Sequence, residues 1–293
     1  MKNDILVLLF AVLAVSCTNR ETYISKQTTN HYAEGFCIEQ ENDYNKVVVF
    51  NPWQDGKVLQ TYYLVKSDTV VVPQDGLKLV VPIKRVATTS CTHIGFLKEL
   101  NMLDVVCGVC NPEIIYDEYI RERVTAGYVK NVGDASMPNV ELIANSAPDV
   151  VMVSTYAQGD AATDKLNKLG MPVIYNNEWT ESHPLARAEW LRFTAAFFDM
   201  LPYADSVFAT IESKYLSLCE LTKDIAHKKT IMSGNNFRGT WYMPSGTTYM
   251  GMLFNDAGAD YFYKNDKSAF SLPLNVETVV MNFSNADVWV WSS

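Results

Sequence analysis

Two stretches of the chain follow one pattern: NVELIANSAPDVVMVS at residues 139–154 and NVETVVMNFSNADVWVWS at residues 275–292. Each begins with an Asn suited to cap a helix, continues through a short helical stretch, and ends in an apolar strand that follows an Asp. A helix dipole favours a carboxylate in the first turn, and each copy has one there, Glu141 and Glu277. Helix capping would explain each Glu separately, but it does not explain why the unit occurs twice.

Short apolar strands alternate with helical stretches around the first copy. We expect strands at 85–88, 105–109, 129–132, 150–154 and 173–175, and helices at 92–100, 116–123, 140–145 and 161–169. This alternation predicts a parallel sheet covered by helices on both faces. Residues 83–183 are therefore expected to form an N-terminal α/β lobe.

A helical connector is expected over residues 184–227. Pro202 interrupts it, and the part that follows repeats apolar residues at helical spacing. About 24 residues at about 1.5 Å per residue give roughly 36 Å, which is enough to join two lobes. A second α/β lobe then spans 228–293. Its expected strands are 230–233, 261–262 and 287–291, its helices 247–257 and 276–282, and a polar and aromatic loop covers 235–244.

Three segments precede the lobes. Residues 1–17 have the form of a lipoprotein signal, in which a short apolar run ends before Cys17, the expected lipidation site. The run is too short to cross a bilayer as a helix, and an ordinary cleaved signal in which Cys17 has no role is the alternative. Residues 18–45 are polar and predict a flexible tether. Residues 46–82 carry β-branched runs with turn signals and predict a small antiparallel β extension.

Composition and motifs exclude several function classes. The net charge is −9 and no Lys/Arg cluster is present, which argues against binding nucleic acid. The chain has no Gly-rich dinucleotide fingerprint, no P-loop and no Gly-x-Ser-x-Gly elbow, which argues against an enzyme. Cys107 and Cys110 have the spacing of a redox or metal pair, but their apolar surroundings favour a place in the core.

A resident metal site is not expected either. The chain has four His residues, which are too few and too scattered to converge on a zinc or manganese ion. His93 is best explained as a satisfied surface or core residue. As ligands to the iron of a bound haem, His93 and Tyr156 both remain open.

Residues 84–292 resemble the periplasmic binding proteins of ABC importers for cobalamin, haem and ferric siderophores. The resemblance rests on the first strand at 85–90, the two copies of the repeated unit, the helix after Pro202, and residues 246–260. It implies two Rossmann-like lobes with parallel sheets joined by a single long helix, in a monomer without intrinsic cofactor. It also implies a periplasmic location, with a lipid anchor in the membrane.

In that family, a Glu at the start of this short helix in each lobe docks into Arg pockets on the permease, and here those positions are Glu141 and Glu277. Charge-assisted Arg–carboxylate pairs give directional contacts. The family continues past the strand at 287–291, so the C-terminal lobe is expected to be incomplete. Residues 46–82 resemble an N-terminal extension in some lipoprotein members.

Ligands of open α/β sheets bind beyond the carboxyl ends of the strands. Aromatic side chains there offer flat contact area for a planar macrocycle or a catechol, and an Arg can pair with a carboxylate. Ordinary packing between the lobes is the alternative for any single aromatic. The expected ligand contacts are Tyr156, Glu178 and Trp179 in the first lobe, and Phe237, Arg238, Trp241 and Phe270 in the second.

These patterns predict a lipoprotein that captures a metal chelate (cobalamin, haem or a ferric siderophore) and delivers it to the permease of an ABC importer. Two alternatives belong to other classes. One is a surface lipoprotein that captures its ligand without an ABC partner, and the other is an α/β enzyme.

Overall fold

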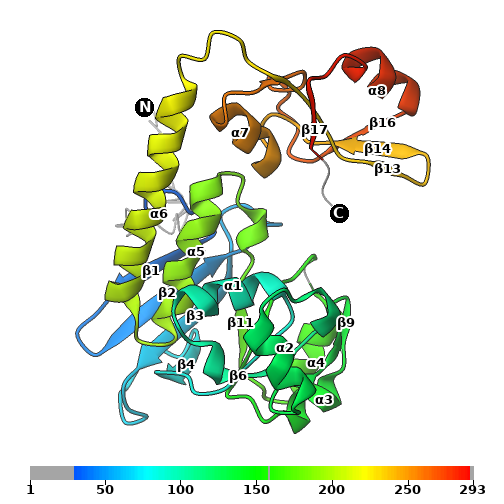
Figure 1. Ribbon diagram of the computed structural model, residues 1–293. Coiled ribbons are helices and arrows are strands. Elements are labelled where there is room, and N and C mark those ends of the chain that lie inside the picture. Colours follow the sequence, from blue (N-terminus) through cyan, green and yellow to red (C-terminus); the bar gives the residue numbers. More distant parts are fainter. Residues whose placement is uncertain (1–29, 158, 291–293) are drawn as a thin grey trace, which may run out of the picture.

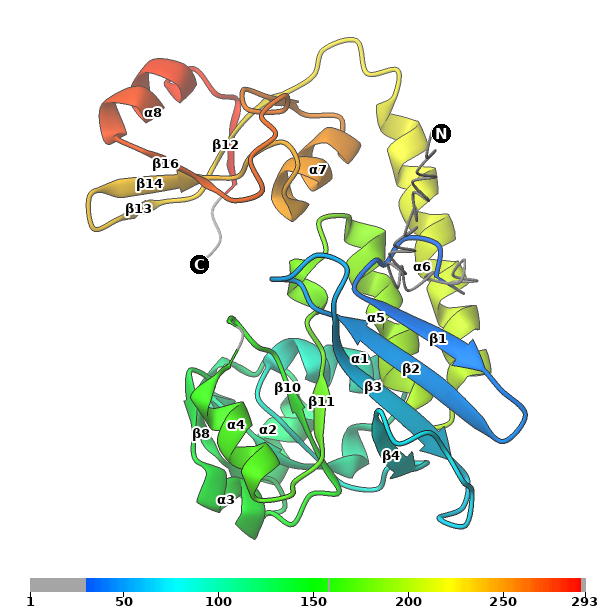
Figure 2. The same ribbon diagram turned by 180° about the vertical axis from the view of Figure 1, so that it is seen from behind.

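The computed structural model describes residues 30–157 and 159–290. Two α/β lobes are joined by the long helix α6 (Leu201–Thr222), which lies beside α5 (Pro184–Ala196) (Figures 1 and 2). The predicted signal, Cys17 and the first part of the predicted tether lie outside the described residues. In the described part of the chain, no helix has the length and apolar character needed to cross a membrane. The predicted fold class is confirmed.

The sheet of the N-terminal lobe has five parallel strands in the order β11-β10-β5-β6-β7. Both faces are covered by helices, so the central strands are apolar throughout, as in β10, where every residue is buried. The strands are β5 (Val86–Thr88), β6 (Val106–Val109), β7 (Lys130–Asn131), β10 (Val150–Val153) and β11 (Val173–Tyr175). The helices are α1 (Cys91–Glu99), α2 (Glu118–Thr125), α3 (Val140–Asn145) and α4 (Ala161–Lys168), and all lie close to their predicted positions.

The C-terminal lobe contains two small sheets. A parallel sheet has the order β15-β12-β17, and an antiparallel sheet has the order β13-β14-β16. Their strands are β12 (Thr230–Ser233), β13 (Asn236–Phe237), β14 (Thr240–Met243), β15 (Asp260–Tyr261), β16 (Leu272–Leu274) and β17 (Val288–Val290). Helices α7 (Tyr249–Asp256) and α8 (Val276–Phe283) pack against them around a core of few buried side chains.

The loop predicted at 235–244 was wrong, because β13 and β14 form a hairpin there. Arg238 and Gly239 make its two-residue turn with φ of 53° and 90°. Positive φ at both turn positions matches the twist of a hairpin. Asn236 Oδ1 accepts a 2.9 Å hydrogen bond from the N–H of Gly239 and closes the turn. An Arg-Gly pair is an uncommon turn signal, so the sequence did not reveal it.

The β extension is longer than predicted. Its sheet has the order β1-β2-β3-β4, with strands β1 (Phe36–Gln40), β2 (Tyr44–Phe50), β3 (Val58–Val65) and β4 (Leu77–Val80). The predicted tether was therefore wrong over β1, whose first residue, Phe36, is fully buried. The all-antiparallel prediction was wrong too, because β3 and β4 pair in parallel.

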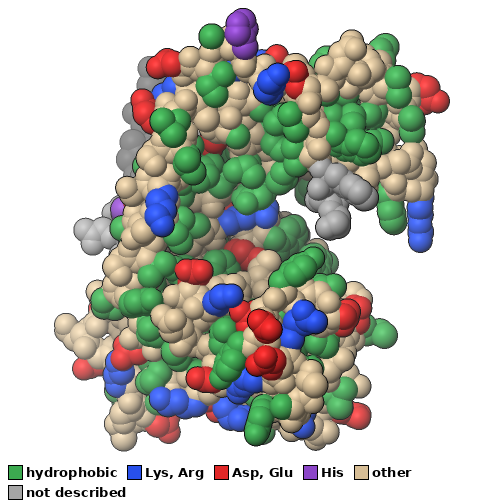
Figure 3. All heavy atoms as spheres, in the orientation of Figure 1, with side chains coloured by type: hydrophobic (Ala, Val, Ile, Leu, Met, Phe, Trp, Pro, Cys, Tyr) green, Lys and Arg blue, Asp and Glu red, His purple; other side chains and the backbone are tan. Residues whose placement is uncertain are grey.

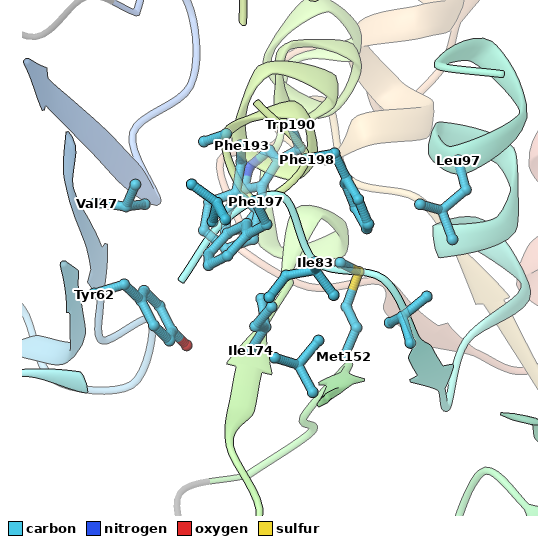
Figure 4. Packing of buried hydrophobic residues seen from close by; sticks show 14 of the residues in the cluster. Val47, Tyr62, Ile83, Leu97, Met152, Ile174, Trp190, Phe193, Phe197 and Phe198 are labelled. Carbon is cyan, nitrogen blue, oxygen red and sulfur yellow. The ribbon is translucent and has the colours of Figure 1, made fainter. Parts of the chain in front are cut away.

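The extension and the N-terminal lobe share one hydrophobic core (Figure 4). Tyr62 from β3 meets Phe197 edge to face with 5.2 Å between the ring centroids. The hydroxyl of Tyr62 donates to the carbonyl oxygen of Val173 over 3.1 Å and accepts from the N–H of Tyr175 over 2.9 Å. A buried hydroxyl with both partners satisfied fixes the extension against β11.

Two buried carboxylates bind the backbone that leads into β1. Glu189 on α5 accepts hydrogen bonds of 2.8 Å from the N–H groups of His31, Tyr32 and Ala33. Glu181 accepts from the N–H of Gly35 over 2.8 Å. A Cβ at Gly35 would lie 2.8 Å from the ring of Trp190, so only Gly allows this approach. Residues 31–35 are far in sequence from Glu181 and Glu189. Because nothing local shows these contacts, the polar segment was predicted as a tether.

The Asp of each repeated unit has the same role. Asp149 accepts 2.9 Å hydrogen bonds from the N–H groups of Lys84 and Arg85, directly before β5. Asp287 accepts a 2.9 Å hydrogen bond from the N–H of Thr230, the first residue of β12. Hydrogen bonds from Thr230 lower the pKa of Asp287. In both lobes the unit thus fixes the start of a central strand.

Replacing Glu189 with Gln should destabilise the protein by about 2–4 kcal/mol, because an amide cannot accept from three N–H groups and Arg192 as a carboxylate does. Urea unfolding followed by tryptophan fluorescence measures the change, and hydrogen exchange at residues 31–33 should rise with it. The control is Glu220→Gln on α6, an exposed acid, which should leave the unfolding midpoint unchanged. Equal midpoints for the two variants would contradict the role of Glu189.

Candidate functional site

A cleft of about 1460 Å³ lies where the two lobes and the β extension meet. The space-filling view shows the molecule hollowed between its two lobes (Figure 3). The extension contributes residues around Gly35 and Trp53, the N-terminal lobe contributes residues around Trp179 and Arg187, and the C-terminal lobe contributes residues around Tyr249 and Phe270. Small-molecule pockets commonly measure about 300–1,000 Å³, so this cleft has room for a large ligand.

Aromatic side chains line the cleft from all three units. Trp179 is held in place because its Nε1 donates a 3.2 Å hydrogen bond to the carbonyl oxygen of Thr155. Its ring centroid lies 5.5 Å from that of Tyr156, a predicted ligand contact that is exposed but does not line the cleft. Phe270 is 81% exposed, so a ligand in the cleft could cover most of its ring. Rigid, flat surfaces of this kind suit a planar or macrocyclic ligand.

Arg187 is a cation of the cleft that the sequence patterns did not predict. It lies on α5, where its Nε donates to the carbonyl oxygen of Glu181 over 2.9 Å and its Nη2 to that of Trp179 over 2.6 Å. Its guanidinium carbon lies 3.9 Å from the ring centroid of Tyr249 on α7. Burial lowers the pKa of Arg187, which nevertheless stays charged at neutral pH. The helical pattern gave no sign that this position faces a cleft.

Glu178 was predicted to contact the ligand, but it is buried beside Trp179 and does not line the cleft. Its Oε2 lies 3.9 Å from Nε2 of His93. His93 is wholly buried, with Nδ1 2.7 Å from Oγ1 of Thr88 and Nε2 3.2 Å from the carbonyl oxygen of Asn176. It is therefore a satisfied core histidine, and no ring nitrogen is free to bind haem iron.

This polar cluster lies at the carboxyl ends of β5 and β11 and holds three buried atoms without a hydrogen-bond partner among the described residues: Oδ1 of Asn176, Nδ2 of Asn177 and Oε2 of Glu178. Buried polar groups are usually paired, and bridging water molecules often complete such clusters. Asn177 of this cluster is connected to Trp179 through Thr155, whose N–H donates to Oδ1 of Asn177 over 2.9 Å and whose carbonyl oxygen accepts from Nε1 of Trp179.

The other ligand contacts predicted in the C-terminal lobe do not line the cleft. Phe237 and Arg238 lie at the tip of the β13–β14 hairpin, with the guanidinium carbon 5.2 Å from the phenyl centroid. Trp241 packs against the core of its own lobe, and its Nε1 donates to the carbonyl oxygen of Ser233 over 2.8 Å. Trp179 and Phe270 are thus the two predicted residues that the structure brings into one cleft.

Glu141 and Glu277 are both exposed in the first turns of α3 and α8. The predicted caps are confirmed: Oδ1 of Asn139 accepts from the N–H of Glu141 over 3.0 Å, and Oδ1 of Asn275 accepts from the N–H of Thr278 over 2.8 Å. Both helices lie on the side of the molecule opposite α6, one in each lobe (Figures 1 and 2).

Candidate metal ligands do not gather elsewhere. Within residues 30–157 and 159–290, no three His, Cys, Asp or Glu side chains are arranged to hold an ion. Cys107 and Cys110 are buried, and burial raises the pKa of both thiols, to about 12 for Cys110. They are protonated at neutral pH and fill the core as predicted.

The chain is similar in sequence to a known protein family and to individual proteins. The sequence profile of the family described as periplasmic binding protein matches residues 86–293. An uncharacterised lipoprotein of Methanocaldococcus jannaschii is 30% identical over 244 residues, which make up 78% of this chain and 58% of the relative. The chain thus spans less than two thirds of that relative's length.

Solved structures of several binding proteins have a similar fold. A periplasmic binding protein from Veillonella parvula gives a TM-score of 0.59 at 14% identity, covering 88% of this chain and 77% of that one. The periplasmic vitamin B12 binding protein of Vibrio cholerae gives 0.53 at 12% identity, covering 72% and 77%. At these identities the similarity concerns the fold alone.

Replacing His93 with Gln should flatten the dependence of stability on pH. Burial lowers the pKa of His93, an effect that nearby Glu178 partly opposes. As pH falls below about 6.5, the unfolded chain binds a proton that the folded chain excludes, so the stability present above that pH is lost. Between pH 6.5 and 5, wild type should lose up to about 1.4 kcal/mol per pH unit more than the variant.

Urea unfolding at several pH values gives these slopes. The control is His227→Gln, since His227 is exposed and its loss should leave the wild-type slope unchanged. A slope for His93→Gln equal to that of wild type would show that the fold does not exclude a proton from His93.

Proposed function

The chain belongs to the periplasmic binding protein family, whose members bind substrates rather than transform them, and from this premise we propose that it captures a metal chelate outside the cytoplasm and delivers it to an ABC importer. The observation that carries the proposal is one cleft between two lobes, together with one exposed Glu in the first turn of the corresponding helix in each lobe. The cleft fits capture of a ligand, and the two exposed Glu residues fit docking on the permease.

The proposed ligand is cobalamin, haem or a ferric siderophore. Trp179 and Phe270 offer aromatic faces to such a ligand, with Tyr156 beside Trp179, and Arg187 offers a charge for a carboxylate, propionate or phosphate group. The solved protein from Vibrio cholerae is named for vitamin B12, which supports this class of ligand. Three residues outside the cleft would contact the ligand only if the two lobes moved closer together: Phe237, Arg238 and Trp241.

Docking is assigned to Glu141 and Glu277. Both side chains are exposed, and neither has an ion-pair partner within the described residues, so both are available to Arg side chains of a permease. Two carboxylates carried by α3 and α8, one helix in each lobe, would fix the orientation of the protein on the permease. The protein is proposed to act as a monomer.

The proposed location is the periplasmic face of a membrane, with a lipid anchor on Cys17. The related protein of Methanocaldococcus jannaschii is named a lipoprotein, and the apolar run before Cys17 has the form of a lipoprotein signal. An anchored binding protein stays near its importer, which raises the effective concentration of the docking partners.

Cyanocobalamin, haemin and a ferric catecholate are the probes for capture. We expect at least one to bind the full chain, detected by its absorbance change on titration. Trp179→Ala should weaken that binding roughly tenfold, because an aromatic face of the cleft is lost. Tyr116→Ala is the control, since Tyr116 is a highly exposed aromatic of the same lobe outside the cleft. If wild type binds none of the three probes, the proposed ligand class is wrong.

The docking residues are tested with the double variant Glu141→Ala plus Glu277→Ala. Uptake of the bound probe in cells or in reconstituted vesicles should be abolished, while ligand affinity stays as in wild type, because both residues lie outside the cleft. The control is Glu118→Ala, an exposed Glu in the first turn of α2. Normal uptake with the double variant would show that the docking assignment of Glu141 and Glu277 is wrong.

A further inference from the structure

The β extension contributes residues to the ligand cleft. The turn between β2 and β3, which we call the 51–57 turn, contributes Asn51, Trp53 and Asp55 to its lining. We propose that this turn is a third wall of the cleft and that Trp53 contacts the ligand and restricts which ligands fit. The inference rests on the proposed function, because it concerns the same cleft.

The 51–57 turn is held in one conformation by its own hydrogen bonds. Asn51 is 8% exposed, and its Oδ1 accepts from the N–H groups of Trp53 over 2.9 Å and Gln54 over 3.1 Å. The N–H of Asn51 donates to the carbonyl oxygen of Lys57 over 2.8 Å. The N–H of Lys57 donates to the carbonyl oxygen of Gln54 over 3.1 Å. A side chain on such a turn is presented at a fixed place, as ligand recognition requires.

The place of the turn is fixed relative to Arg187. The N–H of Phe50 donates to the carbonyl oxygen of Gly35 over 2.8 Å. The N–H of Gly35 donates to Oε1 of Glu181 over 2.8 Å, and the carbonyl oxygen of Glu181 accepts from Nε of Arg187 over 2.9 Å. A continuous series of hydrogen bonds therefore connects the base of the turn to Arg187.

Charges are divided between the walls. The extension contributes the acids Glu34 and Asp55, whereas the two lobes contribute the basic residues Arg187 and Lys267. The N-terminal lobe also contributes Glu181, but this carboxylate is buried and accepts from the N–H of Gly35 and from Nε1 of Trp190. Trp53 is half-buried on the acidic wall. This division favours a flat ligand with an anionic group on one edge, directed at Arg187, and hydrogen-bond donors or a cation on the edge that meets the extension.

The experiment titrates wild type, Trp53→Ala, Trp53→Phe and Lys57→Ala with cyanocobalamin, haemin and a ferric catecholate. For the probe that wild type binds most tightly, Trp53→Ala should weaken binding roughly tenfold, and Trp53→Phe should stay within about threefold of wild type because a flat ring remains. Lys57→Ala is the matched control, because Lys57 is exposed on the same turn but does not line the cleft, and its affinity should be unchanged.

Unfolding midpoints show whether each variant is folded, and Trp53→Phe keeps the test valid if the Ala variant is unstable. If wild type binds a probe and Trp53→Ala binds it equally well, the proposed ligand contact by Trp53 is wrong. The proposal that the protein captures a ligand is then unaffected. The same conclusion follows if Lys57→Ala weakens binding as much as Trp53→Ala, because the effect would then belong to the turn's stability. If wild type binds no probe, the proposed ligand class fails, and the role of Trp53 fails with it.

Discussion

The arrangement of the molecule depends on two buried carboxylates, Glu181 and Glu189, that accept backbone N–H groups from residues 31–35. Burying a carboxylate is costly unless hydrogen bonds replace its water. Each of these two has several donors, although burial still raises the pKa of Glu181. Through them the chain before β1 is bound to α5 and to the segment that precedes it, and Phe36 of β1 packs against Trp190 and Phe193. The same contacts hold residues 33–36 in the lining of the cleft.

The N-terminal lobe could be predicted from the sequence because its signals are local. Four-residue apolar runs such as β10, and a cap such as Asn139, depend on neighbours within a few positions. Strand β1 could not be predicted, since its first residue, Phe36, is buried against Trp190 and Phe193 on the distant α5. The hairpin at Arg238 was missed because its turn uses an uncommon residue pair.

The site was less predictable than the fold. Trp179 and Phe270 were found because aromatic residues next to strand ends tend to meet ligands. Glu178 follows the same strand as Trp179 yet is buried, and the sequence does not show which of two neighbours faces outward. Arg187 and Trp53 line the cleft only because the β extension and the two lobes come together there. No local sequence pattern predicts contacts between such distant segments.

The shared core of the extension and the N-terminal lobe has a consequence for the order of folding. The hydroxyl of Tyr62 meets the carbonyl of Val173 across 111 residues of chain, and His31 meets Glu189 across 158. Synthesis at about 5–20 residues per second separates the appearance of such partners by several seconds or more. Contacts between such distant residues also slow folding. The first strands to be made are therefore among the last to be completed, and their apolar faces need protection during that interval.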